Sequence, residues 1–141
     1  MSRPSDEELH EIYAATQTIA VVGASTDPKK PSHTIPAYMD GQGYRVIGVS
    51  PKGGELFGEP VRASLSEIDA PIDVVDVFRP AAEGPDVVRD AAAAGAKVVW
   101  FQPGTESDAA EAAAAEAGIR YVGGVCIGTT HGRLGLGPGP G

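Results

Sequence analysis

The segment VVGASTDPKKPSH (residues 21–33) has the residue types of a phosphate-binding loop. Gly23 allows the backbone to approach a ligand closely, and the small side chains of Ala24 and Ser25 keep that approach open. Backbone N–H groups in such a loop, and at the start of a following helix, can donate hydrogen bonds to a diphosphate. Lys30 and the lysine before it could add positive charge. The segment therefore predicts a phosphate site, although an ordinary turn with two solvated lysines has the same composition.

The end of the next apolar run, YRVIGVS (residues 44–50), indicates which nucleotide such a loop would serve. Domains that bind NAD usually place Asp or Glu here, where it accepts hydrogen bonds from ribose hydroxyls. This chain has Ser50 and Lys52 instead. A cation in place of the carboxylate disfavours NAD and suits a nucleotide with a phosphate on its ribose, and NADP and coenzyme A (CoA) are the two common candidates. A surface lysine in a loop is the alternative interpretation.

Three further side chains carry chemistry but have plausible structural roles. Arg79 follows the apolar run DVVDVF and could bind phosphate, or it could pair with Asp76 or another carboxylate. Cys126 and His131 could form a nucleophile and base for acyl transfer. They lie five residues apart with no third orienting group, and a buried cysteine at the end of a core strand is the commoner arrangement. We therefore expect no catalytic residues.

The elements that must position these residues alternate along the chain, which favours an α/β fold. Apolar runs predict five strands, and helical signals such as Ser5 before acidic residues, Thr105 as an N-cap and Gly118 as a stop predict the helices. The strands are expected at 18–23, 44–50, 72–78, 96–101 and 119–128, and the helices at 5–16, 31–40, within 80–95, and between Thr105 and Gly118. Pro36 is an unfavourable residue inside its helix. Residues 51–60 read as a glycine-rich connection, and residues 64–68 as a short helical turn.

This order predicts a single-domain, Rossmann-like open parallel sheet of about five strands with helices on both faces. The domain is expected to span residues 1–131, and the Gly- and Pro-rich segment 132–141 is expected to be a flexible tail. In such a sheet, ligands bind at the carboxyl ends of the strands, which is where the candidate residues lie.

Composition excludes several classes of protein. The chain has 141 residues and a net charge of -8, which disfavours broad nucleic-acid binding because that needs a basic surface. A single cysteine excludes an intramolecular disulfide and a multi-cysteine metal site, and we expect no metal. The acidic N-terminus is unlike a secretory signal, and no apolar run approaches the ~20 residues of a membrane span. A cytoplasmic protein without membrane contact is expected.

Six segments, taken in order, resemble the small single-domain CoA-binding proteins, which are related to the CoA-binding domain of the succinyl-CoA synthetase α subunit. These are TIAVVGAS (18–25), GYRVIGVSPK (43–52), LFGEPVRASLSEI (56–68), DVVDVFRP (73–80), AKVVWFQPG (96–104) and VCIGTTH (125–131). The resemblance covers nearly the whole chain with matching spacing. It implies a Rossmann-like nucleotide-binding fold with coenzyme A, or an acyl-CoA, as the ligand.

The resemblance also implies roles for individual positions. The loop from Gly23 toward His33 would hold the diphosphate, Lys52 would be the basic residue after the second strand, and pantetheine and diphosphate would run past the segment after the third strand. Gln102 and Gly104 match the motif of the fourth strand. With the residues argued above, the candidate ligand-binding residues are Gly23, Ala24, Ser25, Lys30, Ser32, His33, Ser50, Lys52, Phe78, Arg79, Pro80, Gln102 and Gly104.

The chain differs from the family pattern near its last strand. Val125 and Thr130 stand where a basic and an acidic residue are common, and Pro103 replaces a plain aliphatic residue. The synthetase relatives use a phosphorylated histidine in a further domain, so His131 does not inherit that role. We expect a CoA-binding protein without catalytic activity of its own, whose partner is a small molecule. The alternatives are an NADP-dependent oxidoreductase and a regulatory or interaction module with a vestigial nucleotide pocket.

Overall fold

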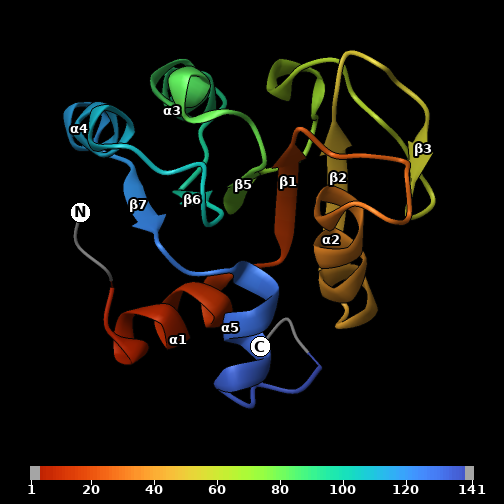
Figure 1. Ribbon diagram of the computed structural model, residues 1–141, viewed down its shortest axis with the longest axis horizontal. Helices are drawn as coiled ribbons and strands as arrows, with labels where there is room; N and C mark the ends of the chain where they lie inside the picture. The colour runs from red at the N-terminus through yellow and green to blue at the C-terminus, as the bar shows by residue number, and fades with distance from the viewer. Residues whose placement is uncertain (1–3, 139–141) are drawn as a thin grey trace.

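The computed structural model describes residues 4–138, which form an α/β domain around one parallel sheet (Figure 1). The sheet has five strands in the order β2 (Arg45–Val49), β1 (Thr18–Val22), β5 (Val74–Val77), β6 (Val98–Phe101) and β7 (Arg120–Gly123). The chain first adds β2 on one side of β1 and then returns to add β5 on the other side. The predicted Rossmann-like parallel sheet is confirmed, and its strand order reverses between β1 and β5, where open α/β sheets bind ligands.

The strands are apolar on both faces because helices cover both faces (Figure 1). On one face, α3 (Gly84–Ala93) and α4 (Asp108–Ala117) pack on alternate strand residues such as Val75 and Val77. On the other face lie α1 (Asp6–Ala15), α2 (Pro31–Gly41) and α5 (Ile127–Arg133), which share a core with Val74 and Trp100. Across residues 4–138, no helix has the length and apolar composition needed to cross a bilayer.

The helix signals were mostly correct, and the exceptions have local causes. Ser5 caps α1 and forms a reciprocal capping box with Glu8. Gly118 ends α4 in the left-handed conformation, with φ of 72°. The prediction that Thr105 caps α4 was wrong. Ser107 is the cap, since its side chain accepts a hydrogen bond from the Ala110 amide, while Thr105 closes the turn after β6 by donating to the Gln102 carbonyl.

Two segments differ from their predicted structure. The connection at 51–60 contains a small antiparallel hairpin of β3 (Glu55–Leu56) and β4 (Glu59–Pro60), whose two-residue turn places Phe57 and Gly58 at positive φ. The last strand is shorter than the predicted 119–128, because the chain turns after Gly123 and residues 127–133 form α5. The boundary predicted between residues 131 and 132 falls inside this helix, and residues 139–141 of the predicted tail lie outside the described residues.

The contact between α3 and α4 yields a stability prediction. A Cβ added at Gly84 would lie 2.9 Å from the Ala110 Cβ and 3.3 Å from a ring carbon of Phe101, so Gly84→Ala must push two buried elements apart. We expect this change to lower the free energy of unfolding by about 1–3 kcal/mol, as overpacking typically does. Urea denaturation measures the change.

Gly41→Ala is the matched control, because a Cβ at this helical glycine meets nothing within 4 Å. It should leave stability unchanged or raise it by up to ~1 kcal/mol through helix propensity. Equal effects of the two alanines would contradict the close approach of α3 and α4.

Candidate functional site

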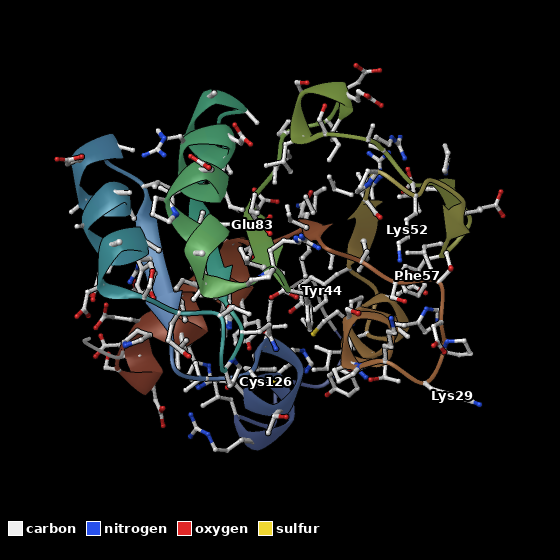
Figure 2. The ribbon with its side chains drawn as sticks, turned by 45° about the horizontal axis from the view of Figure 1, so that its top comes forward. Lys29, Tyr44, Lys52, Phe57, Glu83 and Cys126 are labelled. Carbon is white, nitrogen blue, oxygen red and sulfur yellow. The ribbon has the colours of Figure 1, made fainter. Side chains whose placement is uncertain are left out.

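A cleft of about 640 Å³ opens at the carboxyl ends of β1, β2 and β5. Its walls come from the loop after β1, the turn after β2, residues 61–65, the segment after β5 and the start of α3. In Figure 2, Lys52 lies on the β2 side of this region and Glu83 lies on the α3 side. The cleft occupies the point of strand-order reversal, as expected for a ligand site in this architecture.

Most of the predicted site residues line this cleft. They are Gly23, Ala24, Ser25, Lys30, Ser32, Ser50, Lys52, Phe78 and Arg79. They come from four separate stretches of sequence, and their common position follows from the parallel strands, whose carboxyl ends meet at one edge of the sheet.

The other four predicted residues are not among the residues that line the cleft. His33 supports the loop after β1, with Nδ1 2.8 Å from the Ser25 carbonyl oxygen. Pro80 precedes the short helix η2 (Ala81–Glu83). Gln102 is buried and its Oε1 accepts from the Ile127 amide, while the Gly104 amide donates to Glu106. The groups of His33, Gln102 and Gly104 thus serve structural contacts in this structure.

Gly23 is required by two independent constraints. Its φ is +88°, in the region that side chains disfavour, and an added Cβ would lie 2.9 Å from both the Phe78 carbonyl oxygen and the Arg79 Cδ. Its amide donates to Val49 at the end of β2. The loop after β1 is therefore pressed between the ends of its two neighbouring strands.

Ser25 is held by the first turn of α2. Its amide donates to the Ser32 carbonyl at 3.2 Å, and its carbonyl accepts from His33 Nδ1. This explains Pro36, the unfavourable residue inside the predicted helix. In an α-helix the Ser32 carbonyl would accept from the amide of residue 36, which proline lacks. The carbonyl is thereby left for Ser25, whose own amide is in turn engaged rather than free for a ligand.

The cleft carries three cations, and they differ in their surroundings. The Lys52 backbone amide donates to the Ser50 hydroxyl, which fixes the turn that carries the lysine. Lys30 precedes α2, whose N-terminal dipole favours anions nearby. Arg79 donates to both carboxylate oxygens of Glu83. Of the two uses predicted for Arg79, the structure shows pairing with a carboxylate, and the partner is Glu83 rather than Asp76.

Sequence reasoning missed the wall formed by residues 63–65 and the acidic side of the cleft. Ala63, Ser64 and Leu65 line it because residues 61–63 run beside β2, with Ser50 and Arg62 joined through the Ser50 amide and the Arg62 carbonyl. The motif LFGEPV, which builds the preceding hairpin, was the available signal. Four acids also line the cleft: Asp27, Glu83, Asp86 and Asp90.

Cys126 and His131 are not arranged as a nucleophile and base. His131 is 1% exposed, its Nδ1 is 3.0 Å from the Tyr38 hydroxyl, and its buried Nε2 has no protein partner. Neither ring nitrogen is thus bonded to the thiol. Burial raises the pKa of Cys126, but hydrogen bonds with Thr129, Gln102 and the Gly128 backbone outweigh it, so the pKa lies below its ordinary value.

Asp76 lies on the face of the sheet that packs on α5 and His131. Its side chain is 1% exposed, and its Oδ1 has no protein partner. Burial, with a smaller contribution from nearby Cys126, raises the pKa of Asp76 well above its ordinary value, so the carboxyl favours its protonated form. Burial lowers the pKa of His131 and favours the neutral imidazole. Both shifts thus favour the uncharged form of a group that lies in the core and not among the residues that line the cleft.

Pro36 provides a test of how the loop is held. We expect Pro36→Ala to restore an amide that competes for the Ser32 carbonyl, so the Ser25 amide should exchange with solvent several-fold faster. Hydrogen exchange followed by NMR measures this rate. Pro31→Ala is the control, because Pro31 is the first helical residue and its missing amide breaks no helical hydrogen bond. Unchanged exchange at Ser25 in Pro36→Ala would contradict the role given to this proline.

His131 provides a pH test. Its pKa is lowered in the folded chain, so between pH ~7.5 and ~5.5 the unfolded chain binds a proton at an imidazole of ordinary pKa about 6.5 that the folded chain resists. The contribution of His131 to the free energy of unfolding is thus complete at high pH, and it is lost as the pH falls through this window. The raised pKa of Asp76 gives the opposite slope, so the informative quantity is the difference between variants.

We expect the stability advantage of the wild type over His131→Gln to shrink as the pH falls, by at most about 1.4 kcal/mol per pH unit. Urea denaturation of the two proteins at a series of pH values measures it. Parallel stability curves for the wild type and His131→Gln would refute the interpretation.

Residues 17–132 match the model of the family described as CoA binding domain. The uncharacterized protein YneT of Bacillus subtilis (strain 168) is 37% identical over 131 residues, which cover 93% of this chain and 97% of YneT.

Solved structures include cell-free ID.343 from Thermus thermophilus, with 41% identity, a TM-score of 0.88, and coverage of 93% of this chain and 99% of that one. The dinucleotide-forming acetyl-coenzyme A synthetase 1 of Ca. Korarchaeum cryptofilum is also similar, with 26% identity and a TM-score of 0.71 over 84% of this chain. This chain corresponds to only 27% of that synthetase. The family model, which matches most of the chain around the cleft, shows that this protein belongs to the CoA-binding-domain family.

Proposed function

We propose that this protein binds coenzyme A, free or acylated, in the cleft at the carboxyl ends of β1, β2 and β5. The observation that carries the proposal is the position of Lys52, which lines the same cleft as the Gly23 loop. A cation at the end of β2 suits a ribose phosphate, and a glycine loop at the end of β1 suits a diphosphate. CoA carries both groups, and family membership favours it as the ligand.

In the proposed arrangement, the 3′-phosphate of CoA lies at Lys52 and the diphosphate lies at the Gly23–Ser25 loop. The pantetheine arm leaves past Phe78, which closes the cleft beside Gly23. Family membership supports this arrangement, as does the cleft volume, since ligand sites typically measure 300–1,000 Å³.

We propose binding rather than catalysis as the activity. The support is that neither nitrogen of His131 is hydrogen-bonded to the Cys126 thiol, since Nδ1 lies 3.0 Å from the Tyr38 hydroxyl and Nε2 has no protein partner. An NADP-dependent oxidoreductase would use Lys52 in the same way, so the ligand must be distinguished by experiment.

Lys52→Ala tests the assignment of the 3′-phosphate. Removing a charge-assisted hydrogen bond should weaken CoA binding about tenfold, while dephospho-CoA, which lacks this phosphate, should bind both proteins equally. Isothermal titration calorimetry with CoA, dephospho-CoA, NADPH and NADH measures the affinities. Lys29→Ala is the control, because Lys29, which precedes Lys30, is not among the residues that line the cleft. Figure 2 shows Lys29 at the outer end of the loop after β1.

Binding of NADPH in preference to CoA would replace the proposal with the oxidoreductase alternative. Absence of binding by all four nucleotides would favour the vestigial pocket. An equal loss of affinity for CoA and dephospho-CoA in Lys52→Ala would keep the ligand but move its 3′-phosphate away from Lys52.

A further inference from the structure

Arg79 and Glu83 form a two-pronged ion pair on the rim of the cleft. Arg79 Nε donates to Glu83 Oε1 at 3.0 Å, and Arg79 Nη2 donates to Glu83 Oε2 at 2.7 Å. Both side chains are about half exposed, at 45% and 46%. The pair raises the pKa of Arg79 and lowers that of Glu83, mainly through these hydrogen bonds, so both groups are ionised at neutral pH.

The stem of Arg79 lies directly against the predicted phosphate loop. Its Cδ is 2.9 Å from the position that a Cβ of Gly23 would occupy, and both residues line the cleft. The carbon atom next to the guanidinium therefore lies beside the loop at which the diphosphate is proposed to bind. Figure 2 shows Glu83 on the α3 side of this region, away from Lys52.

The edge of the guanidinium that holds Glu83 is also the edge best suited to phosphate. Nε and Nη2 present two parallel N–H groups, which match two oxygens of a carboxylate or of a phosphate equally well. Glu83 thus offers Arg79 the same pair of acceptor oxygens as the proposed ligand group, from a position four residues away in the chain.

The remaining charge of the cleft makes this competition matter. Asp27, Asp86 and Asp90 line the cleft besides Glu83, so the acidic residues there outnumber the basic ones. While Glu83 neutralises Arg79, an incoming polyanion meets uncompensated cations only at Lys30 and Lys52.

We propose that Glu83 is an internal competitor for Arg79, which a diphosphate-bearing ligand displaces, and that Glu83 thereby sets the affinity of the cleft for its ligand. This inference rests on the proposed function, because it assumes that the bound group is the diphosphate of CoA. In this exchange, the Nε and Nη2 groups of Arg79 cease to donate to the Glu83 carboxylate and donate to a phosphate instead, and Glu83 is released to solvent.

A double-mutant cycle with Glu83→Gln and Arg79→Gln tests the competition. Glu83→Gln should tighten CoA binding about twofold to fivefold, which is the range that exposed ion pairs support. Arg79→Gln should weaken it several-fold. In the Arg79→Gln background, Glu83→Gln should have almost no effect, since no guanidinium remains to be released. Calorimetric titration of the four proteins with CoA measures the cycle.

Asp90→Asn is the matched control for charge alone. Asp90 lines the same cleft and loses the same charge, so any effect on affinity should persist in the Arg79→Gln background. An undiminished effect of Glu83→Gln in that background would overturn the proposal, because it would show a general field effect. Weaker binding by Glu83→Gln would overturn it too, because Glu83 would then be orienting Arg79 for the ligand.

Inorganic pyrophosphate separates this inference from the proposed function. If the wild type fails to bind CoA, the proposed function is wrong, and the same four proteins titrated with pyrophosphate still decide the role of Glu83. Tighter pyrophosphate binding by Glu83→Gln that depends on Arg79 supports the competition, and equal or absent binding in all four proteins overturns it.

Discussion

Neighbouring parallel strands end at the same edge of a sheet, so the chain leaving β1 and the chain leaving β5 emerge side by side. Here Gly23 lies so near Phe78 and Arg79 that a Cβ would lie 2.9 Å from the backbone of one and the side chain of the other. The cleft depends on this contact. It holds the start of the β1 loop between the ends of β2 and β5, and it places Arg79 against that loop.

The face of the sheet that packs on α1, α2 and α5 is stabilised by polar side chains in an otherwise apolar layer. The Tyr13 hydroxyl donates to the Ile127 carbonyl at 2.6 Å, Trp100 Nε1 donates to the Val125 carbonyl, and Gln102 accepts from the Ile127 amide. These bonds converge on the start of α5 and hold a short helix of low apolar content against the core. Buried polar groups that are hydrogen-bonded favour one arrangement, because each loses its partner in any other.

The sequence was sufficient for the parts of the fold that follow from local patterns. The apolar runs 18–23 and 44–50 gave strands within a residue at each end, and parallel order then brought Gly23, Ser50, Lys52 and Arg79 into one cleft. The helix α5 could not be predicted locally, because its sequence IGTTHGR combines glycines with β-branched residues and it is held by distant side chains, Tyr13 of α1 and Gln102 after β6.

The ion-pair partner of Arg79 could not be predicted from the local sequence either. Arg79 had carboxylates nearby in sequence on both sides, and only the path of the chain after β5 shows that Asp76 points into the core while Glu83 reaches the guanidinium. Three of the four acids of the cleft, Glu83, Asp86 and Asp90, have the spacing of one helix face, but only the tertiary structure shows that this face lines the cleft together with Asp27. Tertiary structure decides both.

The hydrogen bonds that hold Ser25 to α2 have a thermodynamic consequence for any ligand that binds in the cleft. Its amide and its carbonyl are both engaged by consecutive residues of α2, Ser32 and His33, before any ligand arrives. Ordering a flexible loop costs about 1–2 kcal/mol per residue in backbone entropy, and a loop already fixed to a helix avoids that cost on association. The proline that weakens α2 as a helix thus contributes rigidity to the loop beside it, and ligand capture should proceed with little loss of backbone freedom at Ser25.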